Sequence, residues 1–211
     1  MGPLTSDLLV RAYSMGVFPM ARSRDDPRLY WIDPEQRGIL PLETFHVSKR
    51  LRRTLRKGGF EIRCDTAFEA VMRACGEPTD DRPDSWINEE IVRLFVELFR
   101  LGLAHSVETW RDGRLVGGLY GLGLGAAFFG ESMFSRETDA SKVALVHLVA
   151  RLKLGGFRLL DTQFVTAHLQ QFGAVEIPRH AYQDLLAAAI GQNAYFDRRP
   201  GLDWQAALLP R

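Results

Sequence analysis

The sequence predicts an α/β fold built around a mixed β-sheet, and two observations lead to this class. From residue 60 onward, runs of residues with the two-residue period of strands alternate with runs that have the roughly 3.6-residue period of helices. A helical pattern over residues 139–156 separates two strand-like runs, residues 126–136 and 157–165, and a helix in that position joins parallel strands. The chain has 211 residues, 46% of them hydrophobic, which is enough for one large domain with a small second one.

Residues 1–58 are predicted to form a small N-terminal domain. Residues 5–16 have the pattern of a short helix that starts after a Thr-Ser pair and ends at a glycine. Residues 18–48 are rich in turn signals and prolines, which indicates loops and short strands. A compact basic helix follows over residues 48–59, with Ser48 as its N-cap and two glycines at its end.

Residues 59–211 are predicted to form the larger domain. The expected elements are a strand, two helices, three strands, a helix, a strand and two helical segments, over residues 60–65, 66–76, 86–102, 104–113, 114–125, 126–136, 139–156, 157–165, 166–174 and 179–190. Asp112-Gly113 is a strong signal for a hairpin turn inside the three-strand meander. This order of elements is of the acetyltransferase (GNAT-like) type, and ligands of such sheets favour the C-terminal ends of the parallel strands.

The numbers of charged residues and cysteines limit which binding sites and which cellular compartment the sequence predicts. There are 27 basic and 26 acidic residues, so a nucleic-acid site would have to be a local patch. Cys64 and Cys75 have no metal-site or disulfide-framework spacing, and both are expected to be reduced core residues. The histidines show no ligand spacing, so no metal is predicted, and His46 and His168 are expected to be structural. No signal-peptide stretch and no run of about 18 apolar residues is present, which predicts a cytoplasmic protein without a membrane span.

A carboxylate interrupts the third strand of the meander. Glu131 shares a strand face with Phe129 and Met133 if the alternation is regular, and an ionised carboxylate there costs several kcal/mol unless it is paired. On the next strand, Asp161 and Gln163 share one face, so three polar groups are expected to converge where the two strands meet. In the alternative, each group is satisfied separately, Asp161 by capping a turn and Gln163 by bonding to neighbouring backbone.

The segment before the crossover helix bears on the type of donor. Acyl-CoA enzymes of this architecture hold the pyrophosphate on backbone N–H groups of a glycine-rich loop. Here the loop is SRETDASK, residues 135–142, which contains no glycine, so CoA is not expected. Arg136, Ser141 and Lys142 can still meet a phosphate at the helix N-terminus, or they form an ordinary cap with solvated charges.

The basic helix and two tryptophans are the candidates for contact with RNA. Trp31 and Trp86 lie beside polar loop residues, and each is either a platform for a base or substrate, or a core or lid residue. The basic helix is either the nucleic-acid footprint of this near-neutral chain or only a solvated face. Its cations are Lys49, Arg50, Arg52, Arg53, Arg56 and Lys57.

Seven segments together carry a resemblance to a known family: GVFPM, YWIDPEQRGILPLETFHVSKRLRR, WINEEIV, GLAHSVETW, LVGGLYGLGLGAAFFGESMFSRETDASKVAL, LLDTQF and FGAVEIPR. The sequence resembles the leucyl/phenylalanyl-tRNA–protein transferases over about residues 7–190, and the GESMFSR…ASK block is the most specific part. The family moves Leu or Phe from an aminoacyl-tRNA to the N-terminal Arg or Lys of a protein, which marks that protein for N-degron degradation. Its catalytic domain is acetyltransferase-like but does not use CoA.

The resemblance implies a role for each candidate residue. The donor ester is already activated, so the enzyme mainly positions an amine against a carbonyl. Asp161 and Gln163 would orient this amine and relay charge as catalytic residues, and Glu131 would meet the cationic end of a substrate. Trp31 and Trp86 would flank the terminal adenosine or the aminoacyl group. The Leu or Phe pocket would be lined by Leu119, Phe128 and Leu145, and the tRNA-binding residues would be Arg50, Arg52, Arg53, Arg56, Arg136 and Lys142.

Two other functions use the same elements. An acyl-CoA N-acetyltransferase would share the architecture, but the glycine-free loop counts against it. A non-catalytic tRNA-binding module would use the basic helix, but it would leave Glu131, Asp161 and Gln163 without a purpose.

Overall fold

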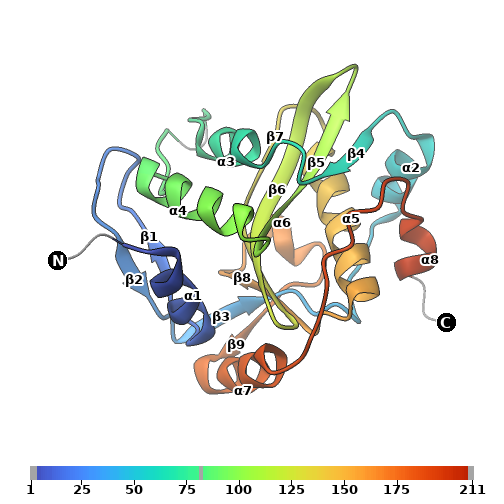
Figure 1. Ribbon diagram of the computed structural model, residues 1–211. Helices are drawn as coiled ribbons and strands as arrows, with labels where there is room; N and C mark the ends of the chain where they lie inside the picture. The colour runs from blue at the N-terminus through green and yellow to red at the C-terminus, as the bar shows by residue number, and fades with distance from the viewer. Residues whose placement is uncertain (1–3, 81–82, 209–211) are drawn as a thin grey trace.

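The computed structural model describes residues 4–80 and 83–208, and its centre is one mixed sheet with helices on both faces (Figure 1). Within these residues the sheet has seven strands in the order β4-β5-β6-β7-β8-β3-β9, and β1 and β2 form a separate ribbon. The strands are β1 (Phe18–Met20), β2 (Tyr30–Ile32), β3 (Gln36–Ile39), β4 (Glu61–Cys64), β5 (Ala104–Arg111), β6 (Arg114–Leu124), β7 (Ala127–Ser135), β8 (Leu159–Gln163) and β9 (Val175–Pro178).

Helices cover both faces of the sheet and form two apolar cores. In Figure 1, α1, α3 and α4 lie on one side, and α2, α5 and α8 on the other, as the two separate clusters of buried side chains require. The helices are α1 (Ser6–Ser14), α2 (Lys49–Lys57), α3 (Phe68–Gly76), α4 (Glu89–Arg100), α5 (Ala140–Gly155), α6 (Ala167–Gln170), α7 (Arg179–Ile190) and α8 (Trp204–Leu208). No helix among the described residues has both the length and the apolar character needed to span a bilayer.

One parallel pair interrupts an otherwise antiparallel sheet. Strands β7 and β8 run parallel, with Phe129 opposite Asp161, and the long helix α5 connects them. Strands β4, β5, β6 and β7 form the expected antiparallel meander. This order confirms the predicted α/β class with a mixed sheet. It also brings the C-terminal end of β8 beside the middle of β7.

Local signals explain where the helices and turns begin. The hydroxyl of Ser48 accepts a hydrogen bond from the Leu51 amide at 3.2 Å and starts α2, as predicted. Asn88 caps α4 in the same way, through the amide of Ile91 at 2.9 Å. Asp112 and Gly113 both have positive φ, 49° and 72°, which is the geometry of the predicted hairpin turn.

Two short elements were not predicted, and one segment is shorter than predicted. The helical segment 166–174 contains only one turn, α6, and Gly173 follows it with a φ of 97°. Strand β9 is an edge strand of four residues, too short for a periodic pattern, and α8 has five residues. Strand β3, from the predicted N-terminal domain, pairs with both β8 and β9 in the large sheet. The domain boundary at residue 58 stays a prediction.

Candidate active site

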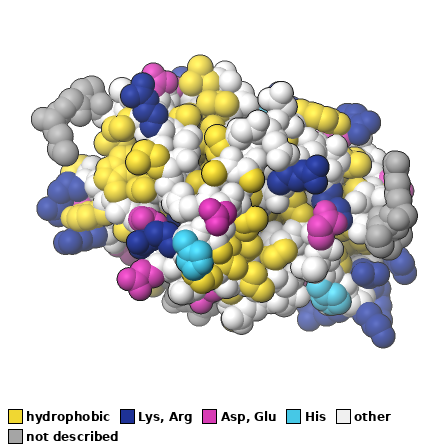
Figure 2. Space-filling model, turned by 90° about the horizontal axis from the view of Figure 1, so that it is seen from below, with side chains coloured by type: hydrophobic (Ala, Val, Ile, Leu, Met, Phe, Trp, Pro, Cys, Tyr) yellow, Lys and Arg dark blue, Asp and Glu magenta, His cyan; other side chains and the backbone are white. Residues whose placement is uncertain are grey.

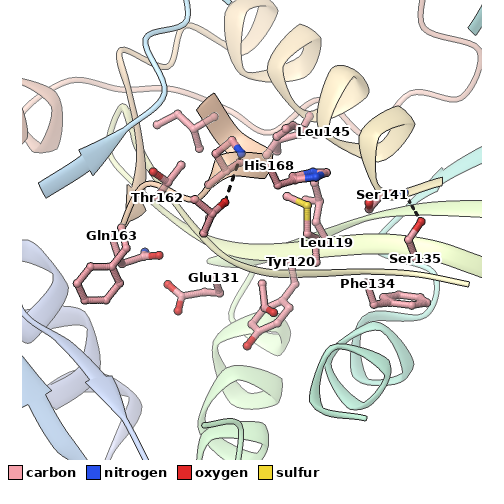
Figure 3. A pocket seen from close by; sticks show the side chains of 18 of the residues that line it. Leu119, Tyr120, Glu131, Phe134, Ser135, Ser141, Leu145, Thr162, Gln163 and His168 are labelled. Carbon is pink, nitrogen blue, oxygen red and sulfur yellow. Dashed lines mark hydrogen bonds between the residues drawn. The ribbon is translucent and has the colours of Figure 1, made fainter. Parts of the chain in front are cut away.

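A cavity of about 480 Å³ opens beside the parallel strand pair (Figure 3). Its wall is mostly apolar and includes three of the candidate substrate-binding residues, Trp86, Leu119 and Leu145. In Figure 3, Glu131 and Gln163 lie on one side of the cavity, while His168 and Leu145 lie on the other. An apolar cavity with a few polar groups at defined places is the usual form of a small-molecule or substrate site.

A β-bulge places Glu131 in the cavity wall. Tyr120 of β6 is opposite Ser132 of β7, but the next pair joins Gly121 to Gly130, so Glu131 is the extra residue of the bulge. The prediction that Glu131 shares a face with both Phe129 and Met133 is therefore wrong for Met133. The bulge reverses the alternation, and Met133 packs against the core on the α5 side.

Glu131 meets a tyrosine from the first helix. The hydroxyl of Tyr13 donates a hydrogen bond to Glu131 Oε1 at 2.8 Å, and the ring of Tyr13 packs on Phe129 with the ring centroids 5.0 Å apart. Burial raises the pKa of the Glu131 carboxyl to about 8, although the hydrogen bond from Tyr13 acts in the opposite direction. Without a cation beside it, Glu131 is therefore mainly protonated at pH 7, and a cation brought next to it would favour the ionised form.

Asp161 is held entirely inside the protein. Its two oxygens accept hydrogen bonds from Nε and Nη2 of Arg37 at 3.0 and 2.6 Å, and Oδ2 also accepts one from the hydroxyl of Tyr182 at 2.7 Å. The Arg37 guanidinium lies over the rings of Phe18 and Tyr182. Asp161 has an exposed fraction of 0% and does not line the cavity. Its carboxylate therefore cannot touch a substrate in this conformation.

Gln163 is the cavity residue that Asp161 positions. The backbone amide of Gln163 donates to Asp161 Oδ1 at 2.8 Å, and this holds Gln163 at a φ of 57°, which is uncommon for a residue other than glycine. The hydrogen-bonding neighbours assign the side-chain nitrogen of Gln163 to the position that faces the carbonyl oxygens of Gly130, at 2.8 Å, and Thr162, at 3.1 Å. That orientation leaves the amide oxygen of Gln163 as the acceptor for a group in the cavity.

Comparison with known proteins gives the family. The model of a family described as leucyl/phenylalanyl-tRNA protein transferase matches residues 39–187, and that of its N-terminal domain matches residues 2–35. The chain belongs to the leucyl/phenylalanyl-tRNA–protein transferase family. A relative of that name from Paramagnetospirillum magneticum is 76% identical over 209 residues, covering 99% of this chain and 100% of the relative. One from Rhodospirillum rubrum is 60% identical over 187 residues, covering 89% and 88% of the two chains.

A solved structure, described as "The structure of L-PGS from Bacillus licheniformis", is also similar to this transferase. The sequence identity is 12% and the TM-score is 0.39, with 78% of this chain and 55% of that chain covered.

Two of the predicted pocket residues of the transferase lie outside the cavity wall. Phe128 is fully buried near the start of β7, where its ring packs against those of Phe157 and Phe196, each at a centroid distance of 5.9 Å. Its side chain belongs to the apolar core on the α5 side of the sheet. Trp31 lies in β2 with an exposed fraction of 40% and also stands outside the cavity wall.

The predicted tRNA-binding residues of the transferase fall into two groups. Figure 2 shows Lys and Arg side chains gathered at its right-hand edge, the side on which α2 lies in Figure 1. Nη2 of Arg136 donates to both carboxylate oxygens of Glu77, each at 2.8 Å, and Nζ of Lys142 donates to Gln171 Oε1 at 3.2 Å. Nη2 of Arg50 lies 3.8 Å from Oδ2 of Asp139. A surface hollow on α2 is lined by Lys49, Arg52, Arg53, Arg56 and Lys57.

Proposed function

We propose that this aminoacyltransferase moves Leu or Phe from an aminoacyl-tRNA to the N-terminal Arg or Lys of an acceptor protein, inside the cavity between β7 and β8. Family membership supports the class of reaction. The observation that carries the site assignment is one carboxyl, Glu131, beside Gln163 in a mostly apolar wall. The product would carry an N-terminal Leu or Phe, which marks it for N-degron degradation in the cytoplasm.

The apolar part of the wall suits the Leu or Phe side chain of the donor. Leu119, Leu145 and Met133 line it, and Trp86 contributes an aromatic ring. A pocket of this kind selects by volume and shape, and a methylene more or less changes binding by only about 1–3 kcal/mol. The proposal therefore includes acceptance of both Leu and Phe rather than of one alone.

Glu131 suits the cationic side chain of the acceptor. An Arg or Lys at the N-terminus of the acceptor would bring a positive charge to a buried carboxyl whose pKa is raised to about 8. The carboxyl would then ionise and form a charge-assisted hydrogen bond, about twice as strong as a neutral one. An acceptor that starts with a neutral residue would leave Glu131 protonated and would gain no such bond.

Gln163 suits the attacking amine. Its amide oxygen can accept a hydrogen bond from the α-amine, and Asp161 acts through it as a positioning residue. In the reaction the amine nitrogen bonds to the ester carbonyl carbon, the carbon–oxygen bond to the ribose breaks, and the proton lost by the amine is matched by one gained by the ribose oxygen. Since the ester is already activated, orientation of the amine is the main contribution asked of the protein.

Helix α2 suits the phosphate backbone of the tRNA. It closes the proposed N-terminal domain, residues 1–58, and its cations line one surface hollow. Contacts of this type release counterions, so binding should weaken steeply with salt and should not depend on the tRNA sequence. Changing Arg52, Arg53 and Arg56 together to Gln should lower the slope of log affinity against log salt by about two.

The matched control for this change uses three exposed arginines outside α2. Replacing Arg11, Arg100 and Arg158 with Gln removes the same total charge, but should leave the slope as it is. Equal slopes for the two triple variants would assign the charges of α2 to a solvated face only.

The decisive experiment is transfer of labelled Phe from charged tRNA to a peptide that starts with Arg. The same peptide starting with Ala is the matched control, and the proposal expects label in the first peptide only. Label in neither peptide, combined with intact tRNA binding, would favour a tRNA-binding module. Turnover of acetyl-CoA with the Arg peptide would favour an N-acetyltransferase.

A further inference from the structure

Two polar atoms in the cavity wall have no hydrogen-bond partner among residues 4–80 and 83–208. They are Oγ1 of Thr162 and Nε2 of His168, and both are shielded from solvent. Buried polar groups are normally paired, because an unpaired one loses its bonds to water without compensation. Two such atoms in the wall of one cavity indicate a polar ligand group that binds between β8 and α6.

The surroundings of His168 show which kind of group this is. Burial and the nearby ammonium of Lys142 lower the pKa of the His168 imidazole, which disfavours its cationic form. Ser141, in the first turn of α5, also lines the cavity, and the N-terminal end of a helix carries partial positive charge. This side of the cavity therefore disfavours a cation and favours a hydroxyl group or an oxygen that gains negative charge.

The cavity is thus electrostatically divided. Glu131 stands on the side that favours a cation, and His168 stands on the other side, next to Leu145 (Figure 3). The two substrates of the proposed reaction differ in the same way. The acceptor brings an amine and a cationic side chain, while the donor brings the two vicinal oxygens of the terminal ribose.

We propose that His168 and Thr162 bind the ribose hydroxyl that lies next to the aminoacyl ester of the donor. This inference rests on the proposed function and adds a specific contact to it. A ribose hydroxyl both donates and accepts hydrogen bonds, which matches the bonding capacity of an imidazole nitrogen and of a threonine hydroxyl. When the ester carbon–oxygen bond breaks, this contact and the positive potential near Lys142 stabilise the oxygen that leaves with the ribose.

The other candidate groups fit this subsite less well. The side chain of a donor Leu or Phe has no polar atom to offer to Thr162 or His168. The ammonium of an acceptor would be repelled by Lys142 and is drawn instead to Glu131. The ribose end of the donor supplies a single neutral group, a hydroxyl, with both donor and acceptor capacity.

The test removes the contact from the protein and from the ligand in turn. The donors are 3′-phenylalanyl-adenosine and its 2′-deoxy analogue, and the readout is the single-turnover rate of Phe transfer to an Arg-starting peptide. We expect wild type to use the deoxy donor about three- to tenfold more slowly. His168→Leu and Thr162→Val should each be slower with the ribose donor, but should show little or no further loss with the deoxy donor.

Conservative variants separate this contact from a structural role. His168→Gln can place an amide nitrogen near the position of Nε2, and Thr162→Ser keeps the hydroxyl, so both should restore preference for the ribose donor. His180→Leu changes an exposed histidine on α7 and should keep the wild-type preference.

The outcomes also separate this inference from the proposed function. If the two contact-removing variants retain the full preference for ribose over deoxyribose, or if wild type shows no preference, the inference is wrong while the function stands. If wild type transfers Phe from neither the adenosine ester nor intact charged tRNA, the proposed function itself fails.

Discussion

Asp161 and Glu131 are carboxyl groups on neighbouring strands, and the fold treats them in opposite ways. Asp161 accepts hydrogen bonds from two nitrogens of Arg37, the hydroxyl of Tyr182 and the backbone amide of Gln163. Glu131 faces the cavity and accepts one, from Tyr13. Burial alone therefore does not identify a functional carboxyl. A functional carboxyl is identified instead by the hydrogen-bonding capacity that remains once its bonds inside the protein are counted. Of these two carboxyl groups, only Glu131 has such capacity left for a ligand.

The largest effect on stability should come from replacing Asp161, the carboxylate whose hydrogen bonds are all made inside the protein. Asp161→Asn leaves the buried guanidinium of Arg37 without a countercharge, so it should lower the free energy of unfolding by about 3–5 kcal/mol. The melting temperature should fall by roughly 10 °C. Arg37→Met should cost a similar amount, and the double variant should cost clearly less than the sum of the two. Additive losses in thermal melts would contradict the buried pair as the source of the stability.

Gln163→Ala should lower the transfer rate rather than the stability, in contrast to Asp161→Asn. The side chain lines the cavity, so its loss should slow single-turnover transfer to an Arg-starting peptide while the melting temperature changes little. If Asp161 acts only through Gln163, the variant with both changes should transfer little more slowly than the poorer single variant. Multiplied losses in rate, measured where all variants are folded, would assign Asp161 an independent role.

Glu131→Gln should separate binding from stability. Transfer to an Arg-starting peptide should fall by about ten- to a hundredfold, because a charge-assisted bond is worth about 1.5–3 kcal/mol. The variant should nevertheless fold at least as stably as wild type. The pKa of the carboxyl is raised by burial from 4.5 to about 8, so the wild-type free energy of unfolding should fall as the pH rises from about 4.5 to about 8.

Glu131→Gln has no carboxyl to ionise, so its free energy of unfolding should exceed that of wild type by an amount that grows over the same pH range. Thermal melts at several pH values, set beside transfer rates at pH 7, check both parts. A variant that is less stable than wild type at pH 8, or that transfers as fast, would contradict the contrast with Asp161.

Most of the fold could be predicted from the sequence because its signals are local. The Ser48 cap, the Asp112-Gly113 turn and the helix between β7 and β8 depend on neighbouring residues, and all three are confirmed. The bulge at Glu131 could not be predicted, because a bulge is a mismatch between two strands and leaves the alternation of each one apparently intact.

The bonding of the two carboxyl groups depends on distant parts of the chain. Arg37 is 124 residues from Asp161, and Tyr13 is 118 residues from Glu131. One signal was available: an arginine directly before the apolar residues of β3 needs a buried partner if that strand is internal, and Asp161 was a candidate. His168 carries no comparable signal, since a histidine in a short polar turn is ordinarily structural.

The smallest effect should come from removing the one hydrogen bond that Glu131 accepts, from the hydroxyl of Tyr13. Tyr13→Phe removes a hydroxyl but keeps the ring that packs on Phe129, so stability should change by only about 1 kcal/mol. The hydrogen bond from Tyr13 lowers the pKa of Glu131, and its loss should raise that pKa further. The pH at which a cationic ligand begins to bind well should therefore move upward.

An N-acetylated peptide that starts with Arg measures this shift, because it keeps the guanidinium and has no α-amine to titrate. As an inhibitor of transfer it should bind wild type more tightly as the pH rises toward about 8, since the carboxyl ionises over that range. The same increase in the inhibitor's affinity should occur at higher pH in Tyr13→Phe and should be absent in Glu131→Gln. An inhibition constant that does not change with pH in wild type would mean that Glu131 does not meet the cation. A rise at the same pH in Tyr13→Phe would mean that the tyrosine only packs, and that Glu131 is tuned by burial alone.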